Sequence, residues 1–136
     1  MKNKFCIYST LFPKSKKFFK EFINSINLQT KQDFDLILCL NGTKLNSSYT
    51  DLIKVPYKLI SCDLPMNKAR VFALKKIMKN YEMITLLDSD DYMSKDRYEL
   101  IRNKIKDNDF FVNNLHIFSK NKSKPKKWLS INKKKN

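Results

Sequence analysis

The stretch Glu82-Met-Ile-Thr-Leu-Leu-Asp-Ser-Asp-Asp91 decides the fold. Its apolar run, residues 83–87, ends abruptly in the carboxylates Asp88, Asp90 and Asp91. A short apolar run that ends in a turn signal is typical of a β-strand buried on both faces. In an open α/β sheet, ligands bind beyond the carboxyl ends of such strands. The stretch therefore predicts a central strand whose carboxylates belong to a binding site.

The three carboxylates also stand out against the composition of the chain. Its 136 residues include 28 Lys and Arg but only 13 Asp and Glu. Clustered carboxylates destabilise a fold unless a positive group offsets them, and a divalent cation is the group that binds such oxygens. The alternative interpretation is a solvated turn that caps the next helix.

The rest of the chain alternates between strand-like and helix-like segments. We expect strands at residues 5–10, 34–40, 57–62 and 83–87, and a last strand at residues 109–118. Amphipathic patterns predict helices at residues 15–29 and 67–80, and a third helix capped by Ser94 that runs through Ile105. Residues 45–53 form a connector with one helical turn. This alternation predicts one α/β domain over residues 1–119, with a mostly parallel sheet and helices on both faces.

The charge of the chain is strongly positive, at +15 with a pI near 9.8. Eight lysines and no acidic residue lie in residues 120–136, for which we expect a solvated, disordered tail. The alternative is a peripheral membrane contact, in which these lysines and Trp128 bind anionic lipid. Nucleic acid is a less suitable partner, because most aromatic residues occupy expected core positions rather than an exposed basic face.

Cys6, Cys39 and Cys62 each lie in an apolar run and lack the C-x-x-C spacing of zinc sites. We expect three buried free thiols and a reducing, cytoplasmic location, at the inner face of the membrane if the tail binds lipid. The amino-terminal apolar stretch is too short for a signal peptide, and no run approaches the ~20 apolar residues of a membrane span.

A single glycine, Gly42, excludes several nucleotide-binding classes. Neither the dinucleotide-binding G-x-G-x-x-G motif nor the P-loop can be formed with one glycine. An EF-hand starting at Asp88 fails because Met93 stands where the loop needs glycine. An aspartate-nucleophile phosphatase needs later carboxylates, and none follows Asp109. A sugar-nucleotide site remains, in which a metal ion held by one or two carboxylates neutralises a diphosphate leaving group.

Five motifs then occur in a characteristic order and spacing. They are Phe22–Thr30, Asp33–Leu38, Asn41-Gly42-Thr43, Ala69-Arg70, and Leu87–Tyr92 followed by Ser94 and Asp96. As an ordered set, over roughly residues 4–118, they resemble the family-two glycosyltransferases, which have the GT-A fold.

This resemblance implies a glycosyltransferase that uses a nucleotide-diphosphate sugar, a UDP-sugar being favoured, and Mn²⁺ or Mg²⁺. The acceptor would be a glycan or a lipid-linked molecule in cell-surface polysaccharide synthesis. The implied metal ligands are Asp88, Asp90 and Asp91, and the implied nucleotide-binding residues are Ser9, Thr10, Asn41, Arg70 and Asp88. The alternatives are that Arg70 is a solvated surface residue, that Asn41 only forms a turn, and that His116 is packed rather than catalytic.

The chain departs from the family pattern at three points. Leu40 stands where the family has an Asp that contacts the base, and Val71 replaces the Asn of Ala-Arg-Asn. An inverting transferase also needs a carboxylate base from a later segment, and this chain has none after Asp109. We therefore expect a truncated reading frame, a base supplied by a partner, or an inactive basic module that binds anionic lipid or nucleic acid.

Overall fold

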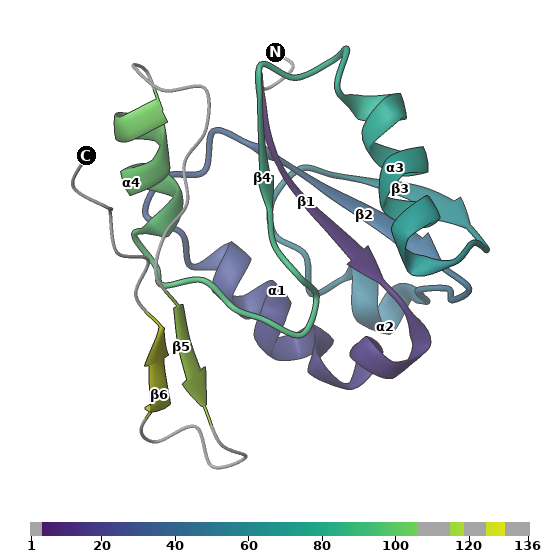
Figure 1. Cartoon of the computed structure of the whole chain (residues 1–136), viewed down its shortest axis with the longest axis horizontal. Coiled ribbons are helices and arrows are strands. Elements are labelled where there is room, and N and C mark those ends of the chain that lie inside the picture. The colour runs from purple at the N-terminus through teal and green to yellow at the C-terminus, as the bar shows by residue number, and fades with distance from the viewer. Residues whose placement is uncertain (1–3, 106–114, 119–124, 130–136) are drawn as a thin grey trace. The chain divides into compact units, whose positions relative to one another are not determined.

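A computed structural model of the chain describes residues 4–105, 115–118 and 125–129 (Figure 1). The chain divides into two compact units, residues 1–99 and 100–136. The sequence pattern predicted a later boundary, after residue 119.

The first unit is built on a four-stranded sheet in the order β3-β2-β1-β4. Its strands are β1 (Phe5–Leu11), β2 (Asp35–Asn41), β3 (Tyr57–Cys62) and β4 (Met83–Leu86). All three neighbouring pairs are parallel, and Tyr8 of β1 is in register with Ile37 of β2 and Leu86 of β4. The predicted strands and the predicted parallel sheet are confirmed.

The helices lie close to the predicted positions. They are η1, a 3-10 helix (Pro13–Phe18), α1 (Phe19–Asn27), the one-turn α2 (Ser47–Thr50), α3 (Met66–Ile77) and α4 (Arg97–Lys104). The predicted helix at residues 15–29 therefore begins as a 3-10 helix, with Pro13 in its first turn. The third helix begins at Arg97 rather than just after Ser94, because residues 93–95 bond to α1 and the corner that follows it.

Two apolar clusters cover the two faces of the sheet. Alternate residues of a strand point to opposite faces of a sheet. In β1, Ile7 and Leu11 therefore pack on the side of α1, whereas Cys6 and Tyr8 pack on the side of α3. The α1-side cluster is the larger. The α3-side cluster includes Ala73 and Ile77 of α3 with residues of β1 and β2. Helices on both faces, as predicted, are confirmed.

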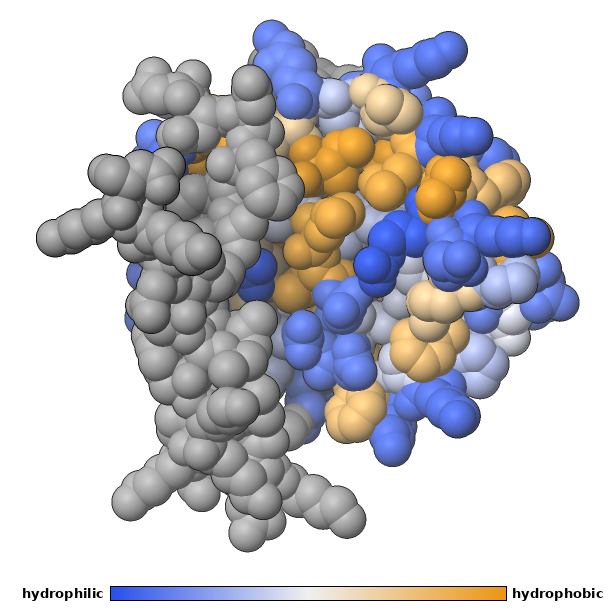
Figure 2. All heavy atoms as spheres, in the orientation of Figure 1, coloured by the Kyte–Doolittle hydropathy of each residue, from blue (hydrophilic) through white to orange (hydrophobic). Residues whose placement is uncertain are grey.

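Strand β4 differs from the prediction, because it is an edge strand among the described residues and not a central one. It pairs only with β1, and Leu86 is 52% exposed, so the expected burial on both faces is wrong. Val71 of α3 and Met78, which directly follows α3, are also exposed. Figure 2 shows apolar groups between β4 and α3, with hydrophilic groups beside them.

The second unit contains an antiparallel strand pair, β5 (Leu115–Phe118) and β6 (Pro125–Leu129). Strand β5 is the carboxyl-terminal part of the last predicted strand, whose residues 109–114 lie outside the described residues. Strand β6 lies within the predicted tail, and its five residues are a strand rather than disordered because they pair with β5. None of the described helices has the length and apolar character that crossing a membrane requires.

Candidate functional site

The candidate site lies at the carboxyl edge of the four-stranded sheet. Strand β2 ends in Asn41, Asp63 directly follows β3, and Asp88 comes two residues after β4. Since all four strands are parallel, their carboxyl ends lie at the same edge. This edge is where open α/β sheets bind ligands.

The turn after β4 presents its carboxylates to solvent because its other residues are anchored inside. The amide of Leu87 donates to the Tyr8 carbonyl at 3.0 Å, which continues the pairing of β4 with β1. Ser89 is buried and its hydroxyl donates to the Ser15 hydroxyl at 2.8 Å. Asp88 and Asp90, which alternate with these buried residues, are exposed. The solvated-turn alternative describes these two side chains, but the turn itself is fixed to the core.

Arg70 and Asp88, two of the predicted site residues, form an ion pair. The Arg70 Nη2 atom lies 2.9 Å from Asp88 Oδ1, and the two side chains are 44% and 65% exposed. Arg70 projects from the first half of α3, whereas Asp88 follows β4. An exposed ion pair contributes at most about 1 kcal/mol to stability, so a ligand can displace either partner at little cost.

Asp91 is exposed like Asp88 and Asp90, but its carboxyl group lies in a more negative and less solvated environment than a free one. Burial raises its pKa above the usual 3.8, and the neighbouring charges of Asp90 and Asp88 raise it further, while Arg97 acts in the opposite direction. Burial lowers the pKa of Arg97, and the charge of Asp91 opposes that effect. The three carboxylates therefore interact electrostatically, with Arg97 as a partial counter-charge at the start of α4.

The donor chemistry of these carboxylates fits a hard divalent cation, which prefers oxygen ligands. The described residues nevertheless contain no group of three or more side chains arranged to hold a metal ion. One carboxylate, Asp88, is engaged by Arg70. Metal binding here would therefore use one or two carboxylates and oxygens of a ligand, and the roles of Asp88, Asp90 and Asp91 as metal ligands stay predictions.

Ser9 and Thr10 point to opposite faces of β1. Ser9 has no exposed surface, and its buried hydroxyl has no hydrogen-bond partner. Thr10 is 6% exposed, and its hydroxyl is 2.7 Å from that of Tyr8. The end of β1 therefore presents mainly backbone groups to a ligand. The predicted contacts of these two side chains with a nucleotide stay predictions.

Asn41 closes β2 against the loop that follows β3. Its side-chain amide donates to the Leu64 carbonyl at 2.8 Å, and its oxygen accepts from the Leu64 amide at 2.9 Å. Gly42 follows with a positive φ of 64°, which favours glycine. Asn41 thus does more than form a turn, since its side chain binds both backbone groups of Leu64, just before α3. Its predicted nucleotide contact stays a prediction.

The corner Gln29-Thr30 holds the carboxylate turn in place, a role that the sequence analysis missed. The Gln29 amide donates to the Ser94 carbonyl at 2.9 Å, and its oxygen accepts from the Tyr98 amide at 3.0 Å. The Thr30 hydroxyl donates to Glu99 at 2.7 Å. Gln29 is 3% exposed. The sequence signal for Gln29 was its position as a polar residue at the end of the predicted amphipathic helix at residues 15–29.

The model of the family described as "Glycosyl transferase family 2" matches residues 10–136. The chain belongs to this family. Among solved structures, S. aureus TarS is similar in fold, with a TM-score of 0.59 at 22% identity over 77% of this chain. Residues 1–349 of TarS give a TM-score of 0.61 at 23% identity, and their complex with UDP-GlcNAc gives 0.60 at 22%. The comparison with curated proteins finds no significant match.

This family-two chain spans 19% of the full TarS chain and 32% and 31% of the two shorter structures. The likeness in fold extends over 77% of this chain, which confirms the predicted GT-A fold class. At the position where the family pattern has an Asp, Leu40 is 5% exposed and packs in the α1-side core. A side chain committed to the core cannot replace the carboxylate that contacts the base.

Proposed function

We propose that this chain is the nucleotide-sugar-binding part of a glycosyltransferase, which transfers a sugar from a nucleotide-diphosphate donor to a glycan or lipid-linked acceptor. The observation that carries the proposal is the exposed pair of Arg70 and Asp88 at the carboxyl edge of the sheet, in a chain of glycosyl transferase family 2. A UDP-sugar is the favoured donor, which the complex of TarS with UDP-GlcNAc supports. Cell-surface polysaccharide synthesis in the cytoplasm is the proposed setting, which the three free cysteines support.

The diphosphate of the donor suits the charges at this edge. Arg70 is a planar donor that binds phosphate oxygens in a bidentate manner. Because its bond to Asp88 is exposed, Arg70 can exchange that carboxylate for a phosphate oxygen without burying an unpaired charge. Asp88 is then free to accept hydrogen bonds from the ribose or to bind a cation.

The proposed cation is Mn²⁺ or Mg²⁺, which Asp88 and Asp90 would hold with Asp91 in support. When bound, such an ion stabilises the charge of the leaving diphosphate as a Lewis acid. The contribution of the chain itself is to hold the carboxylates in position. The buried contact of Ser89 with Ser15 and the bonds of Gln29 fix the turn on both sides.

Transfer of the sugar requires a general base that removes the proton of the acceptor hydroxyl. None of the candidate site residues is proposed for this role. The sequence has no Asp or Glu after Asp109. We therefore propose that the chain binds and orients the donor, and that turnover requires a carboxylate from another polypeptide segment.

Thermal unfolding with UDP, GDP and CDP, each with and without Mn²⁺, tests the proposal. A ligand at a hundred times its dissociation constant stabilises a fold by about 2.7 kcal/mol, which raises the midpoint by about 10 °C in a domain of this size. We expect that shift with UDP and Mn²⁺ together. The Asp90→Asn variant should lose it, and the control Asp51→Asn, whose exposed side chain follows α2, should keep it. A cooperatively unfolding protein that shifts with no nucleotide contradicts the proposal.

The charge of +15 favours a second candidate, a basic module that binds anionic lipid through residues 120–136. Replacing Lys133, Lys134 and Lys135 by Gln should then weaken binding to phosphatidylglycerol vesicles, by about 1 kcal/mol for each lysine removed, and leave any nucleotide-dependent shift intact. Equal vesicle binding by both proteins would reject this candidate.

A further inference from the structure

Two of the three cysteines come together on neighbouring strands. The Sγ atoms of Cys39 on β2 and Cys62 at the end of β3 are 3.5 Å apart. Cys62 is in register with Asn41, two residues after Cys39, so the two thiols are diagonal neighbours. Both belong to the α3-side cluster, Cys39 as a buried member and Cys62 as a partly buried one. The sequence predicted three buried free thiols, because their separation gives no C-x-x-C spacing, but Cys62 is only partly buried.

We propose that Cys39 and Cys62 are a redox-active dithiol that closes to a disulfide across β2 and β3. The oxidant is a low-molecular-weight disulfide. The Cys62 thiolate attacks one sulfur of the oxidant, forms a mixed disulfide and releases the first thiol. The Cys39 thiolate then attacks Cys62 Sγ, the protein disulfide forms, and the second thiol leaves. The oxidant gains the two electrons and two protons that the protein loses.

The order of attack follows from the exposure of the two thiols. Cys62 is half-buried and reachable, whereas Cys39 is buried. Burial, followed by the hydrogen bond and the charge of Cys62, raises the pKa of Cys39 to about 12. The closing step should therefore be the slower one and should accelerate as the pH rises. Cys6, buried on β1 in the same cluster, provides a matched control thiol.

Closure of the disulfide would alter the loop that leads into α3. The sulfur atoms must approach from 3.5 Å to about 2.05 Å. In the reduced protein, the Cys62 thiol donates to Asn41 Oδ1 at 3.5 Å, and that same oxygen accepts from the Leu64 amide. Oxidation removes the thiol donor and pulls on the end of β3. Since α3 begins at Met66 and carries Arg70, the oxidation state of the pair is coupled to the proposed nucleotide site.

The covalent step is tested on the full chain with oxidised glutathione at pH 8, followed by intact mass measurement and peptide mapping. We expect a loss of two hydrogen atoms and a Cys39–Cys62 linkage in the native protein and in Cys6→Ser. In Cys39→Ser, Cys62 should instead retain one glutathione. A native protein that stops at the glutathione adduct, does not react, or links Cys6 overturns the proposal, and none of these outcomes requires a variant to fold.

The coupling to the site rests on the proposed function, and a second measurement separates the two. UDP affinity with Mn²⁺ is compared for the reduced and disulfide forms by calorimetry. We expect the disulfide form to bind roughly tenfold more weakly, since small displacements of positioning groups are costly. Equal affinities in the two forms reject the coupling. If neither form binds UDP while the disulfide still forms, the proposed function fails and the dithiol stands.

Discussion

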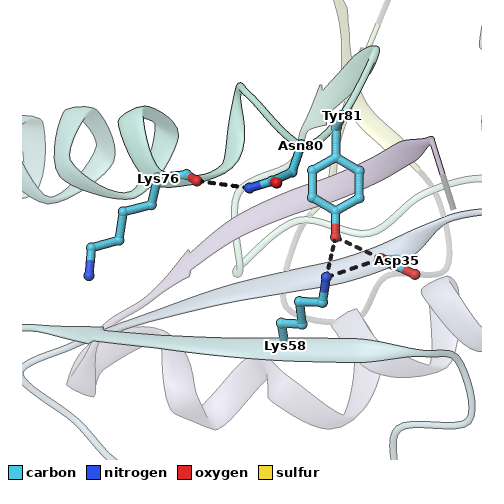
Figure 3. Close-up of polar contacts among 5 residues, drawn as sticks. All are labelled: Asp35, Lys58, Lys76, Asn80 and Tyr81. Carbon is cyan, nitrogen blue, oxygen red and sulfur yellow. Dashed lines mark hydrogen bonds and ion pairs between the residues drawn. The ribbon is translucent and has the colours of Figure 1, made fainter. Parts of the chain in front are cut away.

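Two charge clusters lie at opposite ends of the parallel strands, one at the amino edge, where the strands begin, and one at the carboxyl edge. The two clusters differ in burial. At the amino edge, the Tyr81 hydroxyl donates to Asp35 Oδ2 at 2.6 Å and accepts from Lys58 Nζ at 3.0 Å (Figure 3). Lys58 Nζ also lies 3.7 Å from Asp35 Oδ2. At the carboxyl edge, Arg70 and Asp88 form a single contact.

Burial decides what each cluster can do. The side chain of Asp35 is 9% exposed, whereas the side chain of Asp88 is 65% exposed. Burial, with the hydrogen bond to Asp35, raises the pKa of Tyr81, so the hydroxyl stays protonated and keeps donating. A buried carboxylate that loses its donors is costly, whereas an exposed one can exchange a side chain for a ligand. The amino edge therefore stabilises the fold, whereas the carboxyl edge is available for binding.

The largest expected effect is at the buried cluster. Asp35→Ala leaves the Tyr81 hydroxyl and Lys58 without this acceptor, which should lower the free energy of unfolding by about 3 kcal/mol. Urea denaturation measures the loss. In the control Asp51→Ala, which changes an exposed residue, the free energy should change by less than about 0.5 kcal/mol. Equal losses of unfolding free energy in the two variants would show that the buried cluster stabilises the fold no more than an exposed carboxylate does.

A variant of Gln29 tests whether the hydrogen bonds of a buried polar side chain support ligand binding at the exposed carboxyl edge. Gln29→Met keeps the size of the side chain but removes its hydrogen bonds to the Ser94 carbonyl and the Tyr98 amide, at a cost of about 2 kcal/mol. The variant should also bind UDP more weakly, because the carboxylate turn loses its support. Calorimetry at a temperature where the variant is folded measures this. Unchanged affinity would assign Gln29 to stability alone.

Asp88→Asn should have the opposite pattern to Asp35→Ala. The free energy of unfolding should stay within about 0.5 kcal/mol of the native value, because the ion pair is exposed. The affinity for UDP and Mn²⁺ should fall about tenfold, or about 1.4 kcal/mol. A loss of stability without a loss of affinity would make Asp88 a structural residue and remove the distinction between the two edges.

The smallest expected effect is the pH response of Asp91. Because its folded pKa is raised, its stabilising contribution is present below the usual 3.8 and is lost as the pH rises through the folded pKa. Without metal, Asp91→Asn should therefore unfold at a slightly higher temperature than the native protein at pH 7. The difference should vanish near pH 3.8. A variant that is less stable at pH 7 would show that Arg97 outweighs the neighbouring carboxylates.

Local patterns in the sequence were sufficient for most of the fold. The strand at residues 57–62 was predicted to the residue, and alternation of strands with helices predicted the parallel sheet. The same pattern could not give strand order, because an apolar run such as residues 83–87 looks alike at the centre and at the edge of a sheet. The pairing of β6 with β5 was missed for a related reason, since lysine-rich composition hid a strand whose partner lies earlier in the chain.

The sequence by itself determined that carboxylates follow a strand at the carboxyl edge of a parallel sheet, in an arrangement typical of family-two glycosyltransferases. Only the tertiary structure decided which groups meet there. Arg70 reaches Asp88 across 18 residues, and Gln29 reaches Ser94 and Tyr98 across 65 and 69. The physical reason is that periodicity reports the environment of each segment separately, whereas hydrogen-bond partners depend on how the segments pack.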